Sequence, residues 1–299
     1  MQEYLEKKDF FSLHLGEDQP SQKYLFIDHF ILKIIACIVM TIDHIGLFFI
    51  PQGWPLYEVF RILGRLAFPL FAFLTYEGTL RSKNSYLYSL KLMVLGGIMY
   101  LVVFLITKQN ISNALLTLGL CALISSLVNQ QNKFSFLAII PATIIILSDF
   151  PFFPFYCEYG TYGLLMYIGF MVARYLTLFH EKRLAENSGL DPDVVYSING
   201  RLIQNIYSAG MLLIVNMIML VFYKLYGVTN PLFANFSIPF AYMQYSALAG
   251  LILIFYSGRK GISNKFLTCT FYLYYPLHVV IFYLIFYFGM GGIVSVLLF

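Results

Sequence analysis

The sequence predicts an all-α protein, a polytopic bundle of about nine transmembrane helices, and two observations lead to this class. Of its 299 residues, 60% are hydrophobic and 11% are charged, whereas soluble domains carry about a quarter charged residues. The apolar residues also form long continuous runs rather than short alternating stretches. Runs of this kind favour membrane-spanning helices over the strands of a β-barrel.

Nine apolar runs define the expected helices in chain order. They cover residues 31–50, 57–80, 86–107, 111–128, 134–149, 160–179, 203–226, 238–257 and 267–288. We expect one transmembrane domain over 31–288, a cytoplasmic segment over 1–30 and an apolar C-terminal tail over 289–299. Because no small-residue cleavage site precedes the first run, that run itself is expected to target the chain to the membrane.

The positions of Lys and Arg predict the orientation of the helices. The loops 51–56, 150–159 and 227–237 contain neither residue, and Lys108 alone breaks the pattern. The alternate loops carry the cations, as cytoplasmic loops do. We therefore expect a multi-pass protein of the cell membrane with a cytoplasmic N-terminus and an extracytoplasmic C-terminus. The net charge of +4 is distributed over these loops, so no nucleic-acid partner is expected.

The spacing of the four cysteines excludes the common thiol-based sites. No CxxC pair occurs, and three of the four cysteines fall within predicted helices. We therefore expect neither a disulfide framework nor a metal site. The sequence also lacks the nucleophile elbow, the HExxH zinc motif, the P-loop and the dinucleotide-binding glycine pattern. Candidate chemistry must come from the ionisable residues within the helices.

The first predicted helix contains three such residues, Lys33, Asp43 and His44. A charge within the bilayer costs several kcal/mol, so its presence indicates function. Eleven positions separate Lys33 from His44, which places both on one helix face, about 16 Å apart along the axis. Imidazole is the commonest general base. Asp43 points about 100° away, where it can pair with an arginine of the next helix. The alternative is that Asp43 and His44 only form hydrogen bonds between helices.

The second predicted helix carries Glu58, Arg61 and Arg65 on one stripe. Arginine is permanently charged and suits phosphate or carboxylate partners. Pro69 is expected to kink this helix or open its backbone. The alternative interpretation is a set of salt bridges within the membrane, in which Glu58, Asp43 and Glu77 balance the two arginines. Both interpretations can hold together, since a catalytic cavity needs neutralised walls.

The last predicted helix places His278 near its middle, two residues after Pro276. Its depth resembles that of His44, which favours a shared cavity. The alternative is a core histidine satisfied by hydrogen bonds. Asp149 and Glu158 flank the predicted outer loop 150–159. As acids at the membrane interface they require no functional explanation.

Six motifs, taken together and in order, resemble the TraX family of membrane proteins over residues 32–288. They read LKIIACIVMTIDHIG (32–46), RILGRLAFPLFAFLTYEG (61–78), NALLTLGL (113–120), DFPFFPFYCEYGTYG (149–163), QYSALAGLILIFYSGRKG (244–261) and FYLYYPLHVVIFYLI (271–285). The namesake of the family is associated with N-acetylation of conjugative pilin. The family looks related to membrane acyltransferases that use cytosolic acyl-CoA, in which an arginine precedes a histidine by eleven positions. Lys33 and His44 occupy that spacing.

The resemblance implies an acyltransferase-like fold and an O- or N-acetyltransferase. It would move acetyl from acetyl-CoA to an amine or hydroxyl of an envelope acceptor, such as a pilin-like peptide or a surface glycan, in contact with membrane lipids. His44 would be the general base, and Arg65 would oppose the oxyanion or neutralise Asp43. The implied catalytic residues are His44, Asp43, Arg65 and His278. The implied residues for the CoA phosphates are Lys33, Arg61, Arg259 and Lys260.

Two other functions fit the same residues. A transporter or flippase for a small or lipid-linked polar substrate would also carry charges within the membrane and proline-interrupted helices. Such a protein is expected to show two similar halves, and the sequence contains no such repeat. A non-catalytic partner in a conjugation or envelope complex would use the charges only to hold helices together.

Overall fold

The computed structural model describes residues 24–107, 113–129, 133–150, 153, 155–189, 200–226 and 240–289. Within these ranges the chain is helical and contains no strands, apart from two isolated bridges. The prediction of an all-α chain is therefore confirmed for this part. The predicted segment 1–30 is described only from Tyr24 onward, and the predicted tail 289–299 lies, after Gly289, outside the described residues.

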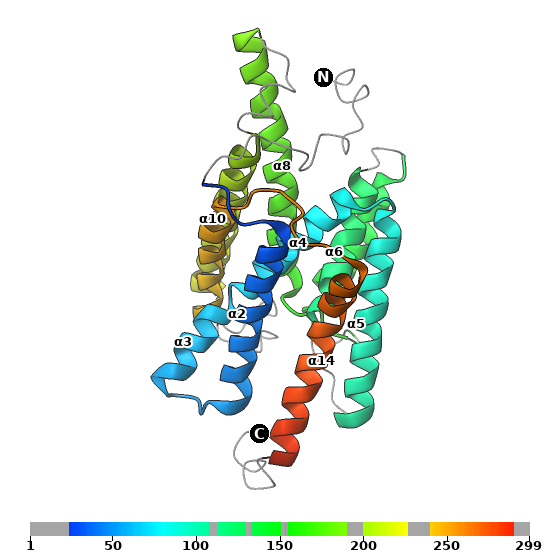
Figure 1. Cartoon of the computed structure of the whole chain (residues 1–299), viewed down its shortest axis with the longest axis vertical. Helices are drawn as coiled ribbons and strands as arrows, with labels where there is room; N and C mark the ends of the chain where they lie inside the picture. Colours follow the sequence, from blue (N-terminus) through cyan, green and yellow to red (C-terminus); the bar gives the residue numbers. More distant parts are fainter. Residues whose placement is uncertain are drawn as a thin grey trace.

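The long helices run side by side along the long axis of the molecule (Figure 1). In chain order the helical elements are α2 (His29–Phe49), α3 (Pro55–Gly64), α4 (Ala67–Arg81), α5 (Ser85–Thr107), α6 (Ala114–Asn129), η1 (Ser135–Ala138), α7 (Ile139–Leu147), α8 (Gly160–Ser188), α10 (Arg201–Tyr226), α12 (Phe240–Met243), η3 (Gln244–Leu248), α13 (Ala249–Ile254) and α14 (Lys265–Gly289). Each of the nine predicted runs coincides with helix.

Six helical segments are long and apolar enough to cross a membrane, and they indicate a membrane protein. They are His29–Phe49, Pro55–Arg81, Ser85–Val102, Gly160–Ser188, Arg201–Leu225 and Lys265–Phe286. The other three predicted runs form shorter apolar helical segments, Ala114–Asn129, Ser135–Leu147 and Gln244–Ile254. The described structure thus contains six candidate spans by length and composition, rather than the nine expected.

The second predicted span is divided into α3 and α4. Pro69 has no backbone N–H and lies in the first turn of α4, so it cannot continue the helical bonding pattern of α3. The backbone tightens there instead: Arg65 N donates to Ile62 O at 3.1 Å and Leu66 N donates to Leu63 O at 3.2 Å. The predicted interruption at this proline is confirmed. It leaves Arg65 at the corner between the two helices.

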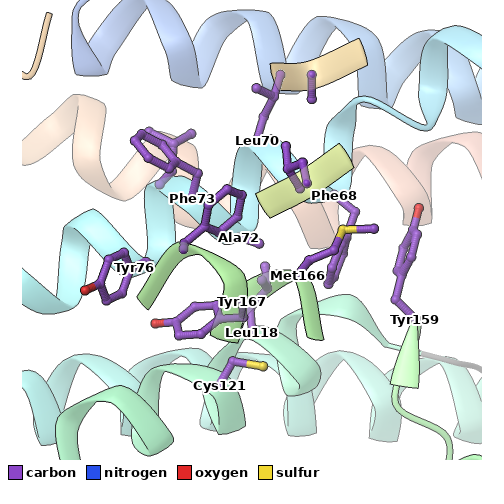
Figure 2. Packing of buried hydrophobic residues seen from close by; sticks show 14 of the residues in the cluster. Phe68, Leu70, Ala72, Phe73, Tyr76, Leu118, Cys121, Tyr159, Met166 and Tyr167 are labelled. Carbon is purple, nitrogen blue, oxygen red and sulfur yellow. The ribbon is translucent and has the colours of Figure 1, made fainter. Parts of the chain in front are cut away.

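The buried core is built around α4, of which all but a few residues are inaccessible. Figure 2 shows its aromatic and aliphatic side chains packed against Cys121 of α6 and Tyr167 of α8. The ring of Phe68 stacks on that of Tyr159, with centroids 3.9 Å apart. The Tyr167 hydroxyl lies 3.0 Å from Ser125 Oγ, so this buried tyrosine keeps a polar partner.

Backbone contacts join the start of α2 to the segment that precedes α14. Ile27 N donates to Phe255 O at 3.1 Å, and His29 N donates to Arg259 O at 2.9 Å. The Asp28 side chain caps α2 by accepting from Ile31 N at 2.8 Å, which satisfies one of the unpaired N–H groups of the first turn. These contacts place the N-terminal ends of α2 and α14 together at one end of the bundle.

Helix α14 lies at the edge of the bundle, with α2 as its principal neighbour. Leu277 and Ile281 on its outer side are 58% and 42% exposed. Almost none of this helix is buried within the protein. Its inner side therefore closes one wall of the interior while its outer side remains open to the surroundings.

The chain enters α8 through a tight turn that depends on glycine. Tyr159 has φ 65° and Gly160 has φ 38°. A Cβ atom on Gly160 would lie 1.6 Å from Asp149 Oδ1, so a larger residue has no room. Asp149 Oδ2 accepts from Thr161 N at 2.9 Å and so caps the first turn of α8. This turn carries Glu158 and Tyr159 to the interior of the bundle.

Candidate functional site

An internal cavity of about 190 Å³ extends along α2. Lys33 lines it toward one end of the helix, and Asp43 and His44 line it toward the other. Its remaining walls come from α4, α5, α6, α14 and the turn before α8. The cavity therefore follows the helix face for about 16 Å, the axial distance from Lys33 to His44. The two predicted residues, Lys33 and His44, line the same space.

His278 supports His44 from the opposite helix. Its Nε2 lies 3.0 Å from His44 Nδ1, and its Nδ1 lies 2.7 Å from the carbonyl oxygen of Tyr274. A carbonyl only accepts, so His278 Nδ1 carries a proton. If both rings are neutral, His44 Nδ1–H then donates a hydrogen bond to His278 Nε2. The other nitrogen of His44, Nε2, carries no proton and keeps its lone pair. In this arrangement His44 Nε2 is free to accept a proton as a general base.

Asp43 joins the two arginines of the second predicted helix. Its Oδ1 accepts from Arg61 Nη1 at 2.7 Å, and its Oδ2 accepts from Arg65 Nη2 at 2.6 Å. Both guanidinium groups are buried. The predicted pairing of Asp43 with an arginine of the next helix is confirmed. Because both carboxylate oxygens hold an arginine, Asp43 orders these cations rather than acting as a base.

Arg65 also faces the turn before α8. Its Nη1 donates to Tyr159 Oη at 3.2 Å, and its Nε donates to Arg61 O at 3.1 Å. These contacts fix the planar guanidinium group at the corner between α3 and α4. Charged donors held in a low-dielectric interior are effective partners for a developing negative charge.

Gly64 allows α3 to approach α2 at this point. A Cβ atom on Gly64 would lie 2.2 Å from Asp43 Oδ1 and 2.3 Å from Asp43 Cβ. Any other residue would displace the carboxylate from Arg61 and Arg65. Gly64 is not among the residues predicted from the sequence. Its position in the RILGRLAF motif, directly before Arg65, is the signal that pointed to it.

Glu158 and Tyr275 complete the deep part of the cavity. Tyr275 Oη donates to Glu158 Oε2 at 3.5 Å, and Thr117 Oγ1 donates to Glu158 O at 2.8 Å. Burial raises the pKa of the Glu158 carboxyl from its ordinary value to about 7, although the nearby Arg65 opposes this shift. An acid described as an interfacial residue from the sequence therefore lines the same cavity as His44.

The four predicted phosphate-binding cations do not form one group. Lys33 lines the cavity, with Nζ 5.5 Å from the centroid of the Phe271 ring. Arg61 belongs to the Asp43 ion pair instead. Arg259 Nη2 donates to the backbone oxygen of Leu25 at 3.3 Å. Lys260 lines a neighbouring hollow. Only Lys33, of the four, faces the cavity itself.

A second buried ion cluster lies at the end of the bundle where α4 terminates. Glu77 accepts from Arg81 Nη2 at 2.8 Å and from Arg201 Nη1 at 2.9 Å. The salt-bridge interpretation, in which Glu58, Asp43 and Glu77 balance Arg61 and Arg65, is therefore confirmed for Asp43 and wrong for Glu77 and Glu58. Glu77 has its own arginines and Glu58 is exposed. Asp43 alone among these acids pairs with the two arginines.

Among the residues that the structure describes, no three His, Cys, Asp or Glu side chains gather in a way that would hold a metal ion. The four cysteines are free thiols, of which Cys269 is exposed. The ionisable groups along α2, α3, α14 and the turn before α8 are thus the candidate site.

The helices and these buried ionisable residues define a polytopic membrane protein with a cavity in its apolar bundle that a few ionisable side chains line. The family model described as "TraX protein" matches residues 29–186, more than half of the chain, so the protein belongs to the TraX family. The matched region contains Lys33, Asp43, His44, Arg65 and Glu158, whereas α14 with His278 lies beyond it.

Two curated proteins are similar to the chain. "Probable fimbrial assembly protein FimC, serogroup H1" of Dichelobacter nodosus is 26% identical over 274 residues, which cover 84% of this chain and 92% of that protein. "Uncharacterized protein RP591" of Rickettsia prowazekii (strain Madrid E) is 49% identical over 43 residues, covering 14% of this chain and 16% of that protein. No solved structure matches the chain.

Proposed function

We propose that the protein is a membrane-embedded acyltransferase that moves an acetyl group from cytosolic acetyl-CoA to an envelope acceptor. The acceptor supplies an amine or a hydroxyl, as on a pilin-like peptide or a surface glycan. The observation that supports this function most strongly is the cavity that extends from Lys33 to His44. A long thioester-bearing arm that enters near Lys33 can bring its carbonyl carbon to the imidazole.

The chemistry assigned to the site needs one base and one cationic donor. His44 Nε2 takes the proton of the acceptor O–H or N–H, and the acceptor oxygen or nitrogen bonds to the thioester carbonyl carbon. Arg65 is fully buried and does not line the cavity, so it opposes the negative charge that develops on the carbonyl oxygen through its field rather than by direct contact. The C–S bond then breaks, and the sulfur of CoA takes the proton back from His44. Bonds and protons balance without an additional reactant.

The similar protein of Dichelobacter nodosus supports an acceptor of the cell envelope. Its printed name refers to fimbrial assembly, and the alignment covers most of both chains. We therefore propose that a surface-filament subunit, delivered from the membrane or the outer side, is the first acceptor to examine. Surface glycans remain the second class to test.

We further propose that all nine helical segments cross the cell membrane, in an acyltransferase-like arrangement with a cytoplasmic N-terminus and an extracytoplasmic C-terminus. The Lys- and Arg-free loops support this orientation. Fusions at the C-terminus test it: alkaline phosphatase activity without fluorescence from green fluorescent protein is expected. Fluorescence from the C-terminal fusion would reverse the assignment.

The decisive experiment for the acyl transfer uses purified protein, labelled acetyl-CoA and envelope fractions. The wild type is expected to label an envelope species, and His44→Ala to lower the rate about 10²- to 10⁴-fold. His180→Ala is the matched control, because His180 contacts Tyr207 in another part of the bundle, at 2.7 Å. Undiminished transfer by the His44→Ala protein would remove the assigned base.

A transporter or flippase is the second candidate, and one observation favours it. Two interrupted helical segments, α3–α4 and α12–η3–α13, contact each other, and broken helices that meet inside a membrane bundle are typical of transporters. Counterflow of a polar substrate in vesicles without acyl-CoA would support transport. Acetylation of an envelope species by the purified protein would instead support the acyltransferase.

A further inference from the structure

A second hollow, of about 580 Å³, lies between α5 and α14 near the start of α14. Three lysines line it, and no Asp or Glu is among its lining residues. The lysines are Lys91, Lys260 and Lys265. We name this hollow the lysine vestibule. Among the described residues its lining is cationic and contains no acid, which favours an anionic occupant.

The lysine vestibule adjoins the cavity that contains His44. Thr268 and Tyr272 of α14 line both spaces. The route from the vestibule to His44 therefore passes Thr268 and Tyr272 and then follows α2.

Membrane topology by itself does not explain this grouping. Cytoplasmic loops accumulate lysine, but several other described cations are neutralised or engaged. Arg81 pairs with Glu77 and Lys182 with Glu186. Arg259, next to Lys260, donates to a backbone carbonyl of the N-terminal segment. The three vestibule lysines differ because they surround an open space that adjoins the candidate site and shares Thr268 and Tyr272 with it.

We propose that the lysine vestibule binds the nucleotide phosphates of the acyl-CoA donor, and that the thioester arm extends from it past Thr268 and Tyr272 to His44. This assignment rests on the acyltransferase function proposed above and specifies where its donor enters. Lysine ammonium groups bind phosphate as point charges. Lys91 and Lys265 thereby replace Arg61 and Arg259, which the structure places in other contacts.

The vestibule predicts a difference between two donors that share one thioester. Acetyl-CoA carries the nucleotide phosphates, whereas S-acetylpantetheine has the same arm and no phosphate. In the variant with Lys91→Gln, Lys260→Gln and Lys265→Gln, KM for acetyl-CoA is expected to rise about threefold to hundredfold, as three exposed charge contacts imply. KM for S-acetylpantetheine and kcat with both donors are expected to stay within about twofold of wild type, because remote contacts that bind substrate and transition state equally change KM.

The matched control removes three other cations, Lys133→Gln, Lys182→Gln and Arg183→Gln, none of which lines either space. Its KM for acetyl-CoA is expected to equal that of wild type. Increasing salt should raise KM for acetyl-CoA in the wild type and in this control, since ionic screening weakens phosphate contacts. The salt effect should be small in the vestibule variant.

The outcomes separate the two proposals. Suppose that all the proteins transfer acetyl and that the vestibule variant has an unchanged KM for acetyl-CoA. This result would refute phosphate binding in the vestibule and leave the proposed acyltransferase function intact. If the wild type transferred acetyl from neither donor, the proposed function would fail. Equilibrium binding of labelled CoA to the purified wild type and vestibule variant then decides the vestibule separately. Weaker binding by the variant alone supports it, and equal binding refutes it.

Discussion

His278 Nε2 lies 3.0 Å from His44 Nδ1, across the contact between α14 and α2. The carbonyl of Tyr274, 2.7 Å from His278 Nδ1, sets the direction of this bond. In neutral rings the proton of His44 is therefore held on Nδ1, and the other nitrogen remains basic. His278 is thus a positioning residue for His44, and the cavity contains one of the two rings.

Removal of the His278 ring should weaken the preference of His44 for the tautomer that carries its proton on Nδ1. His278→Ala is expected to lower kcat about 10- to 100-fold, the range for loss of a group that orients a functional imidazole, with little change in KM. His278→Gln should recover part of the rate, because its amide oxygen can accept from His44 Nδ1. Acetyl-transfer kinetics of both variants check this, and equal losses in the two would indicate a purely steric role.

Gly64 provides a test of the Asp43 cluster without removal of any charge. In Gly64→Ala the new methyl group would overlap Asp43 Oδ1, 2.2 Å away, and force the carboxylate from its arginines. Transfer is expected to fall by at least about tenfold, a 1.4 kcal/mol change in the barrier. Gly97→Ala is the control, since its Cβ would meet no atom within 4 Å. Comparable activity of Gly64→Ala and wild type would show that the cluster tolerates displacement.

Asp43→Asn is expected to destabilise the fold, because it leaves Arg61 and Arg65 buried without their shared carboxylate. Loss of one partner from a buried ion pair costs about 3–5 kcal/mol. Thermal unfolding in detergent or nanodiscs measures the effect. Glu58→Gln changes an exposed acid and should unfold like wild type. An unchanged unfolding temperature for Asp43→Asn would contradict the structural role of the cluster.

Glu158 predicts a pH dependence of stability. Its carboxyl belongs to the turn before α8, and burial raises its pKa from 4.5 to about 7. The folded state therefore holds this proton more tightly than the unfolded state, so the associated stability is fully present below pH 4.5 and is lost as pH rises through about 7. The charged or titratable neighbours that face it are Arg65, Asp43, Arg61, Tyr159 and Tyr275.

Glu158→Gln should make the unfolding temperature less sensitive to pH between about 4.5 and 7, and should raise it relative to wild type at pH 8. The physical reason is that glutamine fills the same space without a charge to desolvate. Unfolding temperatures across this pH range, with Glu58→Gln as the control for removal of an exposed acid, measure the effect. A wild-type slope retained in Glu158→Gln would assign the pH dependence to another group.

Much of the fold followed from the sequence, because lipid-facing helices must be apolar along their whole length. Each apolar run coincides with helix, and Pro69 marked the interruption between α3 and α4. The pairing of Asp43 with the next helix also followed, since its direction on α2 differs from that of His44 by one helical step. Length and apolarity could not decide which of the shorter segments cross the bilayer.

The site itself was only partly predictable. Lys33 and His44 line the same cavity because both lie on one helix face, and their eleven-residue spacing predicts this. Glu158 belongs to a turn whose inward course depends on the left-handed backbone at Tyr159 and the lack of a side chain at Gly160. Spacing also did not predict that Arg259 and Lys260 have different contacts. Arg259 donates to the backbone of the N-terminal segment, whereas the adjacent Lys260 lines the vestibule. Long-range packing decides both points.

The position of α14 at the edge of the bundle makes the bilayer a structural component of the site. This helix supplies His278 and Tyr275 on its inner side, whereas Leu277 and Ile281 are open to the surroundings. Hydrocarbon tails, not protein, would thus press the helix against α2 and keep the two imidazoles in register. Lipid thickness and lateral pressure would then set how well this wall is held, and solubilisation would loosen it before any other part of the molecule.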